Sequence, residues 1–124
     1  MHNKTLTINE IERMIDDLNT VRDTITEALQ IPCDDISSTI AGKYIELQNV
    51  VETADYLNSQ GFRVYTGGCR KGDRKYISND VADTITDINN KGELFTVARA
   101  LFNYNKGKIS TGALIRQLRN IKPG

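Results

Sequence analysis

The sequence has no tryptophan, one histidine, two cysteines and two prolines among its 124 residues, and its formal net charge is zero. The only histidine, His2, stands beside the amino terminus, which gives little support to a histidine-based triad, general acid or metal site. Cys33 and Cys69 lack the close pairing of a zinc or redox motif. We therefore expect two free thiols and no metal.

Long hydrophobic runs are also missing. No apolar stretch approaches the roughly 20 residues needed to span a bilayer, and the first ten residues, MHNKTLTINE, lack the apolar core of a secretory signal. Apolar residues at 39% and charged residues at 26% are close to ordinary globular values. This composition predicts a single domain over residues 1–124, located in the cytoplasm and making no membrane contact.

The motifs of common enzyme sites are absent too. The stretch GGCRKGD does not match a P-loop, and its glycines lack the strand, loop and helix context of a dinucleotide site. Cys69 has no recognisable base that would make it a nucleophile. We expect a protein that is not an enzyme and that carries no cofactor.

The zero net charge conceals an asymmetry between the two halves of the chain. Residues 1–60 contain 11 acidic residues and 4 Lys or Arg, whereas residues 61–124 contain 5 acidic and 12 basic residues. Such a division indicates that the second half binds a polyanion or an acidic partner.

A capping box at Thr7 and Glu10 predicts a helix that ends near Gln30, ahead of Pro32. Two apolar stripes recur every seven residues along it, formed by Ile11, Leu18 and Ile25 and by Met14, Val21 and Ala28. The opposite face of this helix is acidic. It is either exposed to solvent or a docking face for a basic partner.

Residues 35–60 are expected to form one long helix with a kink, making residues 1–60 an acidic helical hairpin. The competing interpretation breaks this helix at Asn49, which with Glu52 forms another capping box. The apolar seam of the hairpin could also serve as a dimerisation surface, giving a homodimer through the N-terminal helices.

A basic segment follows Gly61, the expected end of that helix. Alternation over residues 62–65, a turn at Gly67 and Gly68, and a return over 75–77 predict a small β-hairpin or a basic loop. The cations of this segment are candidate phosphate contacts: Arg63, Arg70, Lys71, Arg74 and Lys75.

Ser78 is then expected to cap a helix that buries one apolar face and ends by Asn90 and Gly92. The buried face comprises Val81, Ile85 and Ile88. Ser78 and Asn79 would lie nearest a DNA groove, and Asn79 and Asp80 could contact bases or cap the helix. The three aspartates of this helix, Asp80, Asp83 and Asp87, oppose binding because carboxylates repel phosphates.

The C-terminal part predicts two more helices, from Glu93 to about Asn105 and from Ser110 onward. No acidic residue occurs after Glu93. This helix pair is expected either to form a second contact to nucleic acid or to rest against the acidic face of the first helix. The predicted fold is therefore mainly α: a helical hairpin, a helix-turn-helix-like unit with an enlarged turn, and a C-terminal helix pair.

Residues 51–85 resemble the DNA-binding recombinase region of large serine recombinases. In that family a helix of the pattern I-A-x-x-L-N-x-x-G precedes an arginine-containing loop, an aromatic residue and a helix that begins with Ser or Thr. Here TADYLNSQG at 53–61, the loop at 63–75 and YISNDV at 76–81 occupy those places. The chain is too short for the family's catalytic domain, so the resemblance implies at most the binding module, with Arg63, Arg70, Lys71 and Arg74 on the DNA backbone.

Two functional hypotheses follow from the sequence. The first is a small DNA-binding regulator or accessory factor of a phage or mobile element. The second is a phage-type inhibitor or adaptor, resembling an anti-CRISPR protein, that binds a host defence complex through its separated charges. The basic segment favours the first hypothesis, and the acidic helix after Ser78 favours the second.

Overall fold

A computed structural model describes residues 6–65 and 73–121 of the chain. Helices account for 70% of this part, and no strand occurs within it, which confirms the prediction of a mainly α fold. The helices are α1 (Ile8–Ala28), α2 (Ile36–Leu47), α3 (Val50–Ser59), α4 (Ser78–Thr86), α5 (Glu93–Asn105) and α6 (Thr111–Ile121).

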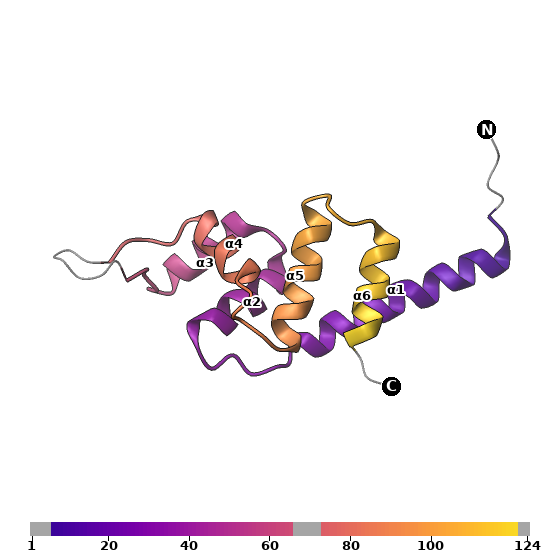
Figure 1. Ribbon diagram of the computed structural model, residues 1–124, viewed down its shortest axis with the longest axis horizontal. Helices are drawn as coiled ribbons and strands as arrows, with labels where there is room; N and C mark the ends of the chain where they lie inside the picture. Colours follow the sequence, from indigo (N-terminus) through magenta and orange to yellow (C-terminus); the bar gives the residue numbers. More distant parts are fainter. Residues whose placement is uncertain (1–5, 66–72, 122–124) are drawn as a thin grey trace.

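Helix α5 is the central element of the fold. Seven of its thirteen residues are buried, and it packs against α1, α2, α4 and α6. In Figure 1 it lies between a pair formed by α3 and α4 at one end of the molecule and a pair formed by α1 and α6 at the other. A helix that is apolar around most of its circumference is expected at such a position.

The packing of α2 on α5 combines aromatic contact with a polar network. The rings of Tyr44 and Phe102 meet edge to face with their centroids 5.9 Å apart, a favourable aromatic geometry. Asn105 donates hydrogen bonds to the Tyr44 hydroxyl at 2.9 Å and to the Gln48 side-chain oxygen at 3.1 Å. Burial raises the pKa of the Tyr44 hydroxyl.

The single long helix expected over residues 35–60 is wrong. Gln48 ends α2 in the left-handed conformation with φ of 51°, and Asn49 opens α3 by accepting a hydrogen bond from the Glu52 amide at 2.9 Å. The competing break at Asn49 is the correct interpretation. The caps predicted at Thr7 and Ser110 are also confirmed, since their hydroxyls accept from the amides three residues later.

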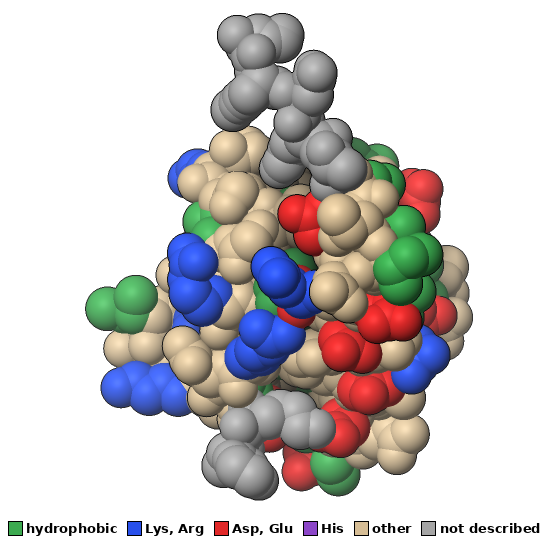
Figure 2. Space-filling view, turned by 90° about the vertical axis from the view of Figure 1, so that its right-hand side faces the viewer, with side chains coloured by type: hydrophobic (Ala, Val, Ile, Leu, Met, Phe, Trp, Pro, Cys, Tyr) green, Lys and Arg blue, Asp and Glu red, His purple; other side chains and the backbone are tan. Residues whose placement is uncertain are grey.

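The helical hairpin over residues 1–60 is not confirmed, because α1 packs mainly against α6 and α5, contacts α2 only slightly and makes no contact with α3. Asp17 of α1 forms an ion pair with Arg119 of α6. The C-terminal helices therefore rest on the first helix, and Asp17 of its predicted acidic face is paired with them, but Glu12, Asp16 and Asp23 are exposed. Seen from this end, Figure 2 shows most Lys and Arg side chains on the left of the surface and most Asp and Glu side chains on the right.

Candidate nucleic-acid interface

The basic segment is held between α3 and α4, which pack directly on each other. Leu57 of α3 and Val81 and Ile85 of α4 are fully buried and anchor the pair in the core. Asn58 then fixes the segment that leads into α4: its side-chain oxygen accepts from the Tyr76 amide at 2.8 Å, and its amide nitrogen donates to the Tyr76 carbonyl at 3.0 Å. One side chain thus satisfies both backbone groups of Tyr76.

A single antiparallel bridge replaces the predicted β-hairpin in the described chain. Val64 and Arg74 exchange both backbone hydrogen bonds, at 2.7 and 3.0 Å. The chain reaches this bridge through Gly61, whose φ of 88° is easily adopted only by glycine. The turn predicted at Gly67 and Gly68 lies outside the described residues.

Two candidate cations adjoin this bridge. The bridge is isolated, and the residues next to it are Arg63 on one segment and Lys75 on the other. Both side chains are exposed. Arg63 also donates to the carbonyls of Phe62 at 2.7 Å and Asn58 at 3.3 Å, which orients its guanidinium group.

Arg74 is engaged with the first turn of α4. Its guanidinium donates two hydrogen bonds to the Asp80 carboxylate, at 2.9 and 2.8 Å, and a third to the Lys75 carbonyl at 3.0 Å. The bonds from Arg74, together with one from the Ile77 amide, hold the pKa of Asp80 below its ordinary value despite partial burial. Arg74 is therefore a positioning residue, with fewer donors left for a phosphate than the sequence suggested.

The expected capping role of Ser78 is wrong. Ile77 occupies the cap position, and its amide donates to the Asp80 carboxylate at 2.9 Å, while Ser78 is already the first helical residue. Ser78 is half-buried and Asn79 is exposed at the start of the helix. The remaining two candidates, Arg70 and Lys71, lie outside the described residues.

The second half of α4 differs from expectation too. The helix ends at Thr86, so Ile88 lies beyond it and is 80% exposed instead of buried. Asp83 and Asp87 are exposed, as predicted for the polar side. Arg99 of α5 closes this end by donating to the Ile85 carbonyl at 2.8 Å and to the carbonyls of Asp87 and Asn90.

Sequence reasoning missed two of the residues that shape this site. Asn58 was visible as part of the recombinase-like pattern, but that pattern does not indicate which backbone groups the side chain holds. Arg99 gave no local signal, because the carbonyls that it binds lie 9 to 14 residues earlier in the chain.

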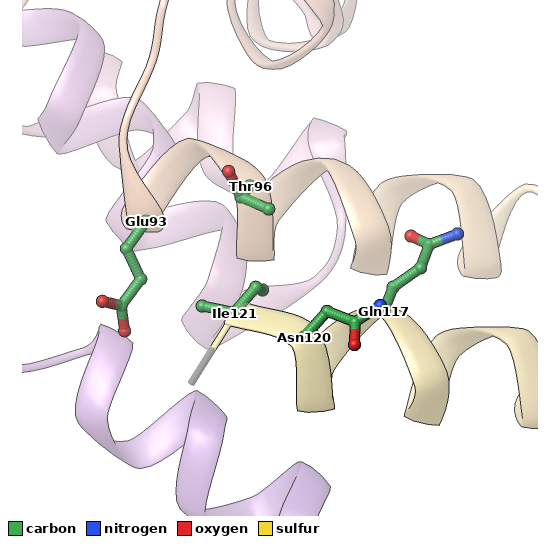
Figure 3. Close-up of a pocket in the computed structure, with 5 residues that line it drawn as sticks. All are labelled: Glu93, Thr96, Gln117, Asn120 and Ile121. Carbon is green, nitrogen blue, oxygen red and sulfur yellow. The ribbon is translucent and has the colours of Figure 1, made fainter. Parts of the chain in front are cut away.

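Other surfaces of the described chain offer less chemistry. A groove of about 480 Å³ between the start of α5 and the end of α6 is lined by Glu93, Thr96, Gln117, Asn120 and Ile121 (Figure 3). Glu93 is the only titratable residue in that lining, which leaves the groove without an acid and base pair. Residues 6–65 and 73–121 hold no cluster of three potential metal ligands and no helix able to cross a membrane.

Comparisons of the chain with protein-family models, with curated proteins and with solved structures found no match.

Proposed function

We propose that this chain is a small, non-enzymatic DNA-binding protein that contacts the phosphate backbone through the bridged segment before α4. In this proposal α3, the segment and α4 form a helix-turn-helix-like unit with an enlarged turn. Arg63, Arg70, Lys71 and Lys75 supply the charge for the backbone, Arg74 positions α4, and Ser78 and Asn79 lie nearest the groove.

The observation that carries the proposal is the bridge between Val64 and Arg74, because the exposed cations Arg63 and Lys75 adjoin it on the two segments. A phosphate bound by the two side chains forms charge-assisted hydrogen bonds with both of them. The Arg74 pair with Asp80 supports the proposal as well, because it neutralises the aspartate in the first turn of α4.

The resemblance of residues 51–85 to the recombinase DNA-binding region supports the same assignment. That resemblance, with the absence of enzyme motifs, favours a regulator or accessory factor of a phage or mobile element. Asp83 and Asp87 restrict the contact to the amino-terminal turn of α4, since the rest of its exposed side would repel phosphates.

A charge-matched pair of variants tests the proposal. Arg63→Gln with Lys75→Gln removes the two cations next to the bridge, and Arg13→Gln with Arg22→Gln removes two exposed cations from α1, at the other end of the molecule (Figure 1). Fluorescence anisotropy with a labelled random duplex at low salt should show weakened binding for the first variant and unchanged binding for the second. Equal binding by both variants would reject the assigned surface.

The exposed acidic side of α1 favours a second candidate function, a protein-binding inhibitor or adaptor. Glu12, Asp16 and Asp23 are exposed along this helix and would suit a basic surface, such as the nucleic-acid-binding face of a host complex. Affinity capture with the wild-type chain and with Glu12→Gln, Asp16→Asn, Asp23→Asn tests it. A specific partner retained by the wild type and lost by the variant is expected, and identical captured proteins would reject the idea.

A further inference from the structure

The first half of α1 carries an apolar face that the described chain leaves uncovered. Ile8, Ile11, Met14, Ile15 and Leu18 are between 36 and 69% exposed. Further along the same helix, Val21 and Ile25 pack against the core and Ala28 belongs to it. One continuous stripe is therefore buried at its carboxyl end and open at its amino end, where α1 projects beyond the body of the molecule (Figure 1).

We propose that a second copy of this chain covers this face, forming a two-fold homodimer in which the projecting halves of two α1 helices pack antiparallel. The proposal is independent of DNA binding, since it concerns the end of the molecule opposite α3 and α4 (Figure 1).

The stripe is self-complementary, as a two-fold interface requires. Its apolar positions, 8, 11, 14, 15, 18 and 21, are symmetric about the midpoint between Met14 and Ile15. In the antiparallel register centred there, Ile11 faces Leu18 of the second copy and Met14 faces Ile15. The spacings of three and four keep all of these positions on one helical face.

Charge complementarity supports the same register. It places Glu10 of the second copy level with Asn19, on the side of the stripe that carries Asp17 seven residues later. Arg119 reaches α1 at this level, because it is paired with Asp17 and its side chain remains 52% exposed. Glu10 of each α1 thus comes near a basic residue of α6 in the other copy.

The area required by a stable dimer also points to α6. The stripe from position 8 to 21 is about 20 Å long on a helix about 10 Å wide. A typical stable interface buries about 800 Å² on each partner, so the surface beside α1 must contribute. A hollow of about 100 Å³ between α1 and α6, lined by Met14, Asp17, Leu18, Thr111 and Ile115, adjoins the stripe and extends it onto α6.

The oligomeric state tests the proposal directly. Analytical ultracentrifugation of the wild-type chain over a concentration series should show a reversible species with the mass of two chains. Ile11→Glu with Leu18→Glu should weaken the dimer on the order of a hundredfold or more, because two apolar contacts per chain become charges. Ile88→Glu makes the same change at an exposed residue beyond α4 and should leave the dimer intact.

Circular dichroism separates a lost dimer from a lost fold, because the substituted residues are exposed in the single chain and the helix content should not change. A wild-type chain that stays monomeric at every concentration overturns the proposal. So does a double variant that remains as dimeric as the wild type, or an Ile88→Glu chain that dissociates.

Disulfide trapping tests the antiparallel register. In a background with both native cysteines changed to serine, Ile15→Cys lies at the two-fold axis and should form a covalent dimer on mild oxidation. Ile8→Cys should not, because the two copies of position 8 are about 20 Å apart along the helix axis, far beyond the roughly 7 Å limit for bridging. Efficient trapping at position 8 would indicate parallel helices and overturn the register.

Discussion

Arg74 and Asp80 bind each other through two hydrogen bonds, of 2.9 and 2.8 Å, that join the basic segment to the first turn of α4. The pair changes the interpretation of both partners. Asp80, whose carboxylate was expected to repel DNA, is neutralised by Arg74. Arg74, a predicted contact to the DNA backbone, instead holds the first turn of α4. The proposed contact surface therefore depends on Arg63 and Lys75.

The stabilising effect of this ion pair should depend on pH. Arg74 lowers the pKa of Asp80 in the folded chain, so the pair stabilises the fold above the unfolded pKa of about 3.9 and loses this effect as pH falls through the lower folded pKa. Asp80→Asn should cost about 1 kcal/mol of unfolding free energy at neutral pH, and the difference from wild type should shrink in acid. Urea denaturation at neutral and acidic pH measures both.

Asp83→Asn is the control for that experiment, because Asp83 is an exposed carboxylate of the same helix for which the described chain shows no ion pair. It should alter stability by less than about 0.5 kcal/mol at either pH. A pH dependence equal to that of Asp80→Asn would mean that the Arg74 pair is not the cause.

Removing the two hydrogen bonds between the Asn58 side chain and the Tyr76 backbone should loosen the segment that leads into α4. Asn58→Ala deletes both hydrogen bonds to the Tyr76 backbone and should cost about 1 to 3 kcal/mol. Hydrogen exchange should then accelerate at the Tyr76 amide. Asn120→Ala, at an exposed position of α6, serves as the comparison and should stay close to wild type. An unchanged exchange rate of the Tyr76 amide in the Asn58 variant would contradict the proposed role of Asn58 in holding this segment.

The buried contact between α3 and α4 should dominate the stability of this end of the molecule. Leu57 is fully buried, so Leu57→Ala should lower the unfolding free energy by about 2 to 5 kcal/mol. Ile88→Ala should change it by less than about 0.5 kcal/mol, because this side chain is mostly in solvent. A similar loss for both, measured by thermal denaturation, would show that Ile88 is buried after all.

Thr24 should be a site where substitution stabilises the protein. Its side chain is fully buried in α1, and its hydroxyl has no hydrogen-bond partner within the described chain. Thr24→Val should therefore raise the unfolding free energy by about 1 kcal/mol. Thr53→Val is the matched control. The buried Thr53 hydroxyl donates to the Asn49 carbonyl at 2.8 Å, so its removal should not stabilise the protein. A loss of stability in Thr24→Val would indicate that the Thr24 hydroxyl does have a hydrogen-bond partner.

The sequence predicted the elements governed by local chemistry. The capping residues Thr7 and Ser110 and the extent of α5 follow from neighbouring residues and were identified correctly. The end of α2 at Gln48 was not identified. The left-handed conformation of Gln48 is rare for a residue with a side chain, and the apolar periodicity across it remains helical. The periodicity therefore favours one continuous helix, and only the capping box at Asn49 and Glu52 indicates the break.

Long-range pairings could not be read from the pattern. The apolar stripe of α1 predicted packing against the helix expected over residues 35–60, whereas α1 packs mainly on α5 and α6. Residue type and proximity in sequence indicate the candidate cations, but they do not reveal that Val64 pairs with Arg74 or that the Arg74 side chain pairs with Asp80. Such relationships depend on backbone register, which composition does not fix.

The salt dependence of duplex DNA binding tests the central claim most directly. Each phosphate contact contributes about 0.9 to the slope of log affinity against log salt concentration. The wild-type chain should bind random duplex with a steep slope, and Arg63→Gln with Lys75→Gln should reduce that slope by about 2. No binding by the wild type at low salt, or an identical slope in the variant, would contradict the account.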